Sequence, residues 1–215
     1  MNNKHLMHNY ALKVLILNRG VFPIPRSGSG GGAEHHAYLL AKELSKSHKV
    51  YFITRLSRRL DIGSNVKVIP IILNRTYIPT NVGFISWILK HLFAGLFVAY
   101  RAFKMLAKQS FNVIHAHGNL STLIVSFFKR RTPLIYTVHD STPWVGYYTS
   151  KFERIIRKLA FICVELLAWK RADHIIAVDK GIKREAIRFG IPEDKCSVIP
   201  SGVVIQPSNF MSVID

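Results

Sequence analysis

Short apolar runs alternate along this chain with longer segments whose apolar positions recur every three or four residues. Runs of this length are typical of buried strands in a parallel sheet. They lie at 13–18, 49–54, 66–73, 112–115, 134–138, 174–178 and 197–199. The helical period appears at 33–47, 83–108, 120–128, 152–171 and 181–189. The alternation predicts βαβ units, and hence a Rossmann-like, doubly wound α/β domain whose mainly parallel sheet carries helices on both faces.

Two details refine the predicted elements. Pro70 lacks a backbone N–H, which favours an edge position for the strand at 66–73. The segment 152–171 is strongly amphipathic, with one apolar side formed by Ile155, Leu159, Ile162 and Leu166.

Length and composition set the organisation. With 215 residues, 49% of them hydrophobic, the chain can bury one large core, which excludes a wholly disordered protein. We predict an N-terminal tail at 1–11, a Rossmann-like domain at 12–200 and the start of a linker at 201–215. Two cysteines, Cys163 and Cys196, are too few for a disulfide framework and favour a reducing, cytoplasmic location.

The charge points to a polyanionic partner. Lys and Arg number 30 against 12 Asp and Glu, a formal charge of +18. One face of the 83–108 helix carries Lys90, Arg101, Lys104 and Lys108, with Ala94 and Phe97 in the same stripe. Arg154, Arg157 and Lys158 would extend this patch.

Two interpretations of the basic face stay open. It is either the solvated side of a helix packed on the core, or an interfacial helix that docks on anionic lipid at the cytoplasmic membrane face. The apolar run at 84–100 approaches the length of a membrane span, but Lys90 and His91 interrupt it.

A glycine-rich loop follows the first predicted strand and leads directly into a helix. Gly31 and Gly32 permit a close backbone approach, and the free N–H groups of the helix N-terminus suit a diphosphate. A flexible turn is the alternative. No acid ends the second strand, where Arg55 stands instead, so an NADP-dependent reductase stays open as a further interpretation.

Histidines mark the ends of two other strands. His115 and His117 close one, and His139 followed by Asp140 closes the next. In a parallel sheet these ends share an edge with the glycine loop. We interpret His115 as a core histidine and His139 as a site residue. No metal is expected, because no cysteine accompanies the histidines and their spacing fits no common ligand pattern.

Several segments, in this order and at this spacing, resemble a known family. They are GGAEHHAYLLAKELSKSHKV from Gly31, FNVIHAHG from Phe111, IYTVHD from Ile135, and RADHIIAVDKGIK through VIPSG to Gly202. The chain resembles the N-terminal domain of retaining nucleotide-sugar glycosyltransferases of GT-B fold, in the group with bacterial mannosyltransferases, sucrose synthase and glycogen synthase relatives (family 4-like).

The resemblance implies roles for matching residues. Gly31 and Gly32 should face the donor diphosphate, and His139 should lie beside the donor sugar as the catalytic residue. We expect Glu34, His35, His117 and Asp140 to contact the acceptor or substrate, although His35 stands where the family often has Arg. Same-face attack would retain the anomeric configuration, with the departing phosphate helping to deprotonate the acceptor. No metal or other cofactor is expected beyond the nucleotide-sugar substrate.

The resemblance also implies a missing half. Related enzymes bind most of the nucleotide sugar with a second Rossmann-like domain after the phrase that matches 198–202. We therefore expect an acceptor-side half-enzyme, inactive alone, whose acceptor is a glycan or lipid-linked glycan. A nucleic-acid-binding domain is the rival from another class, but no helix-turn-helix, zinc finger or RNP-like motif accompanies the charge.

Overall fold

The computed structural model describes residues 11–22, 32–56, 62–71, 84–140 and 151–202. Seven strands form one sheet in the order β3-β2-β1-β4-β5-β6-β7, and every neighbouring pair is parallel. They are β1 (Lys13–Phe22), β2 (Lys49–Leu56), β3 (Val66–Ile71), β4 (Val113–Ala116), β5 (Leu134–Val138), β6 (His174–Ala177) and β7 (Cys196–Val198). This confirms the α/β prediction.

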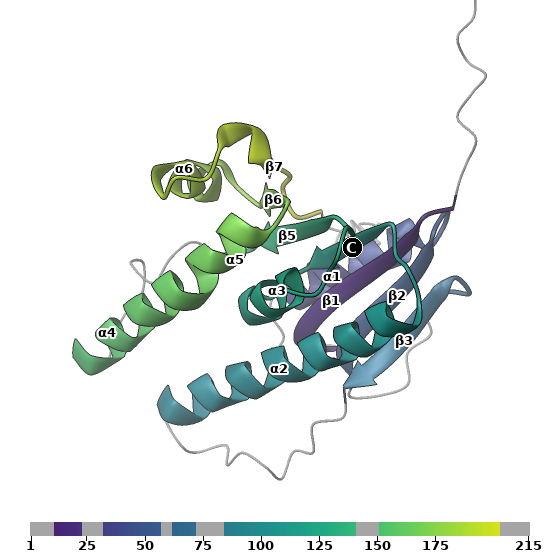
Figure 1. The fold of residues 1–215 in the computed structure, drawn as a ribbon, viewed down its shortest axis with the longest axis horizontal. Helices are drawn as coiled ribbons and strands as arrows, with labels where there is room; N and C mark the ends of the chain where they lie inside the picture. Colours follow the sequence, from purple (N-terminus) through teal and green to yellow (C-terminus); the bar gives the residue numbers. More distant parts are fainter. Residues whose placement is uncertain (1–10, 23–31, 57–61, 72–83, 141–150, 203–215) are drawn as a thin grey trace, which may run out of the picture.

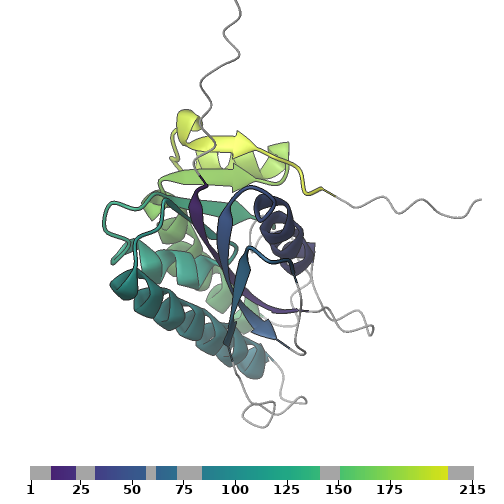
Figure 2. The same cartoon turned by 90° about the vertical axis from the view of Figure 1, so that its right-hand side faces the viewer.

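Helices cover the two faces of the sheet unequally (Figures 1 and 2). The helices are α1 (Gly32–Leu44), α2 (Phe84–Lys108), α3 (Asn119–Ser126), α4 (Lys151–Ala160), α5 (Leu166–Arg171) and α6 (Lys180–Arg188). A π-helical turn, η2 (Phe161–Glu165), joins α4 to α5, and a 3-10 turn, η3 (Glu193–Lys195), precedes β7. Figure 2 shows α1 on one side of the sheet and α2 and α3 on the other.

Two apolar cores follow from this arrangement. On one face, Ala37 and Ala41 of α1 pack against Val14, Ile16 and Phe52 of the sheet. On the other face, a larger core unites apolar side chains of α2, α3, α5 and α6 with residues of all seven strands. Its fully buried members include Val98, Val125, Trp169, Ile182 and Ile175.

Strand positions match the apolar runs, with one informative confirmation and one informative difference. β3 is an edge strand and contains Pro70, as its missing N–H predicted. β1 extends to Phe22, four residues beyond the predicted end, and its register against β2 shifts between Leu17 and Val21. The first strand therefore continues into the segment that composition alone marked as loop.

The amphipathic helices present a reversal. Of the predicted apolar side of the 152–171 segment, Ile155, Leu159 and Ile162 are exposed, and only Leu166 packs against the core. Glu153, in contrast, is buried. Within the stripe of α2, Phe97 is exposed but Ala94 is buried against the core, so Ala94 does not belong to the outward face. Among the described residues, no helix is long and apolar enough to cross a membrane.

The difference between core and surface apolar residues predicts unequal mutational costs. Phe52 is fully buried between β2 and α1, and Phe52→Ala should lower the free energy of unfolding by about 3–5 kcal/mol. Phe152→Ala removes the same ring from a position 64% exposed and should cost less than about 1 kcal/mol. Urea unfolding of both variants checks this, and equal losses would contradict the core assignment.

Candidate functional site

The parallel register brings the ends of β1, β4 and β5 to one edge of the sheet. Leu17 of β1 pairs with Ala116 of β4, and Ala116 in turn pairs with Tyr136 of β5. The backbone N–H of His117, directly after β4, donates to the carbonyl of Leu17 at 2.9 Å. His139 directly follows β5. Both histidines therefore lie at the carboxyl edge, where parallel α/β sheets bind ligands.

Four histidine rings meet at this edge, and we call them the histidine cluster: His36, His115, His117 and His139. His117 stacks on both His115 and His139, with ring centroids 4.6 Å and 5.3 Å away. His36 comes from α1, and its ring centroid lies 5.5 Å from His117 and 5.1 Å from His139. The cluster thus joins the first helix to two strand ends.

Hydrogen bonds fix the orientation of the rings. Nδ1 of His117 lies 3.0 Å from Nε2 of His139, so the two rings share one hydrogen bond. Nε2 of His115 bonds the Thr137 hydroxyl oxygen at 2.6 Å. Nδ1 of His36 bonds the Ser201 hydroxyl oxygen at 3.0 Å, which ties α1 to the segment after β7.

Burial keeps three rings of the cluster neutral. Desolvation, with smaller contributions from the nearby rings of His36 and His139, lowers the pKa of His115 to about 3. Desolvation likewise holds the pKa of His117 well below the usual histidine value, with contributions from its three neighbours. Burial also lowers the pKa of His36. At neutral pH these three rings are therefore uncharged hydrogen-bonding groups.

The His117–His139 pair has a preferred tautomer. Nε2 of His117 is buried without a hydrogen-bond partner. If His139 donated in the shared bond, the proton of neutral His117 would sit on that buried Nε2 and face no acceptor. A buried N–H without an acceptor is rare and costly, so His117 donates from Nδ1 to His139. His139 then carries its proton on Nδ1.

A buried carboxyl group, that of Glu165, bonds strand β5 from the helix side. Glu165 lies in η2, and its Oε1 accepts hydrogen bonds from the Tyr136 hydroxyl and the Trp169 indole N–H, both at 2.7 Å. Burial raises the pKa of Glu165, and the Asp140 carboxylate raises it further, against the hydrogen bonds that lower it. Single π-helical turns recur near functional sites.

The predicted site residues divide into groups. His117 and His139 lie in the cluster, and His115 is buried as expected, although its hydrogen bond goes to a side chain. His35 points to the surface near Tyr38, with ring centroids 6.4 Å apart, while Glu34 is half-buried on the same helix. Asp140 is exposed at the end of β5.

The glycine loop is described only at its last residue. Gly32 begins α1, and a Cβ atom added there would meet no other atom within 4 Å. Gly31 and the side chain of Lys90 lie outside the described parts of the structure. Among the described residues, none therefore crowds the backbone of Gly32 at the start of α1.

Two members of the site escaped the sequence analysis. His36 lies four residues before Leu40, on the same side of α1, and this helical phase could have distinguished it from His35. Ser201 is 165 residues from His36 in sequence, so only the folded chain brings them together.

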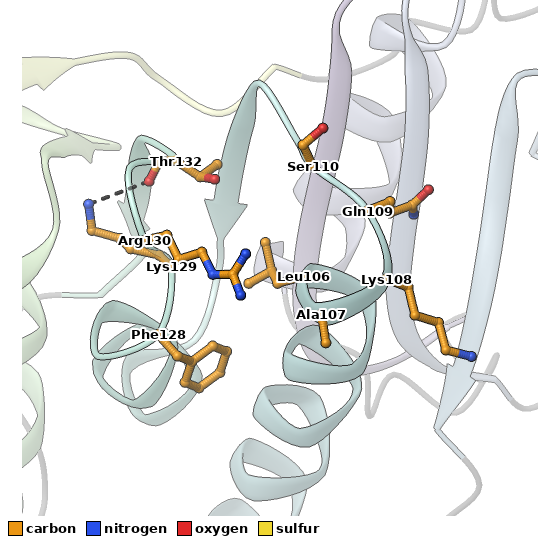
Figure 3. Close-up of a pocket in the computed structure, with 9 residues that line it drawn as sticks. All are labelled: Leu106, Ala107, Lys108, Gln109, Ser110, Phe128, Lys129, Arg130 and Thr132. Carbon is orange, nitrogen blue, oxygen red and sulfur yellow. Dashed lines mark hydrogen bonds between the residues drawn. The ribbon is translucent and has the colours of Figure 1, made fainter.

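Among the described side chains, no group of three or more His, Cys, Asp or Glu residues is arranged to hold a metal ion. Figure 3 shows a separate hollow of about 260 Å³ at the opposite end of the sheet. Its lining comes from Leu106 to Ser110 after α2 and from Phe128 to Thr132 before β5, far along the strands from the histidine cluster. The histidine cluster lies at the carboxyl edge of the sheet instead.

A parallel α/β sheet whose carboxyl edge carries a glycine-led helix start and a polar cluster defines a Rossmann-like ligand-binding domain. The chain belongs to Glycosyltransferase Family 4, whose family model matches residues 30–206. This confirms the resemblance to GT-B glycosyltransferases drawn from the motifs. No curated protein sequence matches the chain significantly.

Solved structures share the fold. Sucrose-phosphate synthase from Thermosynechococcus elongatus is 20% identical with a TM-score of 0.57, over 90% of this chain and 48% of that one. UDP-N-acetylglucosamine 2-epimerase from Rickettsia bellii is 14% identical with a TM-score of 0.55, over 89% and 45%. UGT2 from Phytolacca americana is 12% identical with a TM-score of 0.54, over 92% and 53%. The chain spans about half the length of these proteins.

The neutral state of His115 predicts a pH-dependent stability. Its pKa is lower in the fold than in the unfolded chain, so the stabilisation is complete above pH 6.5 and declines as the pH falls toward 3. His115→Gln cannot protonate, and below about pH 5.5 it should reduce the slope of unfolding free energy against pH by about 1.4 kcal/mol per unit.

Urea unfolding at a series of pH values measures this slope. Ile175→Val, a buried change in β6, serves as the control, because it costs about 1 kcal/mol while leaving every titrating group in place. A slope in His115→Gln as steep as in the unchanged chain would show that His115 titrates normally in the fold.

Proposed function

We propose that this chain is the acceptor-binding half of a retaining glycosyltransferase that transfers a sugar from a nucleotide-sugar donor to a glycan or lipid-linked acceptor. The observation that carries the proposal is the neutral histidine cluster beside the open start of α1. The family membership favours a transferase over an NADP-dependent reductase or a nucleic-acid-binding domain.

The start of α1 would receive the donor diphosphate. Free N–H groups and the positive end of the helix dipole attract an anion there. The open space around Gly32 lets an oxygen approach the backbone more closely than a larger side chain would allow. Gly31, the preceding residue of the motif, would share this contact.

His139 would contact the donor sugar near its anomeric carbon. Because His117 donates to Nε2 of His139, His139 is set in the tautomer that donates from Nδ1. Such a donor orients a sugar oxygen without adding a positive charge next to a developing oxocarbenium ion. In the proposed same-face reaction, the acceptor oxygen forms its bond to the anomeric carbon as the phosphate bond breaks. The departing phosphate takes the acceptor proton.

The acceptor would lie along the rim of the same edge. Glu34, His35 and Asp140 are the polar residues we assign to it, with His117 beneath them. No metal is required in this scheme, because the helix N-terminus and a second, donor-binding domain would supply the charge stabilisation. We place the enzyme in the cytoplasm, since an exposed free thiol at Cys163 suits a reducing compartment.

Replacing His139 should reduce transfer. In the protein that carries its donor domain, His139→Ala should lower kcat at least about 100-fold, because one oriented polar contact to the transition state is lost. The control is His48→Asn, which lies before β2 at the opposite end of the sheet and should leave kcat unchanged. Release of nucleoside diphosphate measures kcat, and the anomeric proton coupling of the product shows whether configuration is retained. An unchanged rate in His139→Ala, or an inverted product, would contradict the mechanism.

The chain alone should be nearly inactive. If most of the donor site lies in a second domain, the 215-residue chain should release no nucleotide from UDP- or GDP-sugars above the uncatalysed rate. If the reading frame continues beyond Asp215 into such a domain, the protein that carries both parts is the positive control. Robust turnover by the 215-residue chain would overturn the half-enzyme assignment.

A further inference from the structure

The outer side of α2 is apolar where a solvated helix would be polar. Its exposed large apolar side chains are 40–51% accessible and lie on one side of the helix. They are Leu89, Leu92, Phe93, Leu96, Phe97, Tyr100 and Phe103. The opposite side, with Ala94, Val98 and Ala102, already packs against the sheet. The folded domain therefore uses one side of α2 for its core and leaves a second apolar side uncovered.

A second helix repeats this arrangement. Along α4, η2 and α5, large apolar side chains are 44–64% accessible on the outer side. They are Phe152, Ile155, Leu159, Ile162 and Leu167. Phe161, Ala168 and Trp169 on the inner side belong to the same core as α2. We define the docking face as these two sets of exposed apolar residues.

Both parts of the docking face lie in the same layer. The α2, α3 and α5 helices cover one face of the sheet, with α3 packed between the other two. Figure 1 shows α2 and the α4–α5 segment as the two long helices of this layer, with α3 between them. Exposed apolar side chains in such number on two helices of one layer mark an interaction site.

Charge identifies the partner. The sequence of α2 contains no Asp or Glu, and its cations are Lys90, Arg101, Lys104 and Lys108. The single acid of α4, Glu153, is buried and bonded to Arg157 at 2.8 Å. Lys104 lies over the ring of Tyr100, with Nζ 4.7 Å from the centroid. Among the described side chains, the exposed charges of both helices are thus all positive, and Lys104 adjoins an exposed ring.

We propose that this face docks the domain on an anionic lipid bilayer, with α2 and α4 lying flat in the interface. Apolar side chains flanked by Lys and Arg are the pattern of helices that insert into the boundary between headgroups and acyl chains. A nucleic acid would meet the cations but leave the aromatic and aliphatic side chains in water. The absence of exposed acids among the described residues of these helices opposes a basic protein partner.

This inference goes beyond the proposed transferase reaction and does not depend on it. Vesicle binding requires no sugar donor, and transfer to a soluble acceptor requires no vesicle. The two proposals can therefore fail separately. Together they would place a lipid-linked acceptor beside the domain that binds it.

Flotation with vesicles tests the docking face. The 215-residue chain should bind vesicles of phosphatidylcholine with 30% phosphatidylglycerol at least about tenfold more tightly than neutral phosphatidylcholine vesicles, and high salt should reduce that difference. Lys104→Gln with Lys108→Gln should weaken anionic binding about fivefold for each cation removed. Phe93→Asp with Tyr100→Asp should abolish binding to both vesicles.

Matched controls separate docking from folding. Ile187→Asp with Ile199→Asp changes two exposed apolar residues outside the docking face and should bind vesicles like the unchanged chain. Circular dichroism should show that both pairs of variants remain folded, as expected for exposed positions.

Four results would overturn the proposal. These are no vesicle binding, equal binding to neutral and anionic vesicles, equal loss of binding in the control pair, and tighter binding to duplex DNA than to anionic vesicles. Sedimentation velocity tests the remaining possible partner of this face, a second copy of the chain. A dimer that Phe93→Asp with Tyr100→Asp dissociates, without vesicle binding by the unchanged chain, would assign the face to a second copy.

Discussion

The parallel register of β1, β4 and β5 is the constraint on which the rest of this molecule depends. Because the three strands run in one direction, the residues that follow β4 and β5 arrive at the same edge, beside the start of α1. The contacts among His115, His117 and His139 follow from that register, whereas α1 adds His36. A slip of one residue would turn alternate side chains to the other face of the sheet and take His115 away from Thr137.

Burial then determines the chemistry of the cluster. Histidine in water would be partly charged near neutral pH, but desolvation makes the charged form of His115 and His117 unfavourable. The neutral rings still fix one another's tautomers. The hydrogen bond between His117 and His139 decides which nitrogen of His139 carries its proton and donates. A site for a charge-developing reaction gains from such preorganised, uncharged groups.

The helix layer shows a second consequence of the fold. The docking face lies on α2 and on the α4–α5 segment, whereas the histidine cluster lies on α1 and at the ends of β4 and β5. Glu165 of η2 links the helix layer to the sheet through Tyr136 of β5. The proposed docking face and the candidate site are thus built on one sheet, because the inner sides of α2 and α5 pack in its core.

Local patterns predicted the elements because apolar period and glycine or proline placement act over a few residues. The seven strands and the edge position of Pro70 followed in this way. The glycosyltransferase family followed instead from the resemblance of several motifs to known members. Local pattern alone did not select His36 over His35, and did not show that Ile155 and Ile162 face outward. Those outcomes depend on how helices pack across the sheet and on contacts such as His36 with Ser201, which span most of the chain. The sequence thus determined the elements and the chemistry present, whereas the tertiary structure decided which side chains meet, because burial is a property of the packed whole.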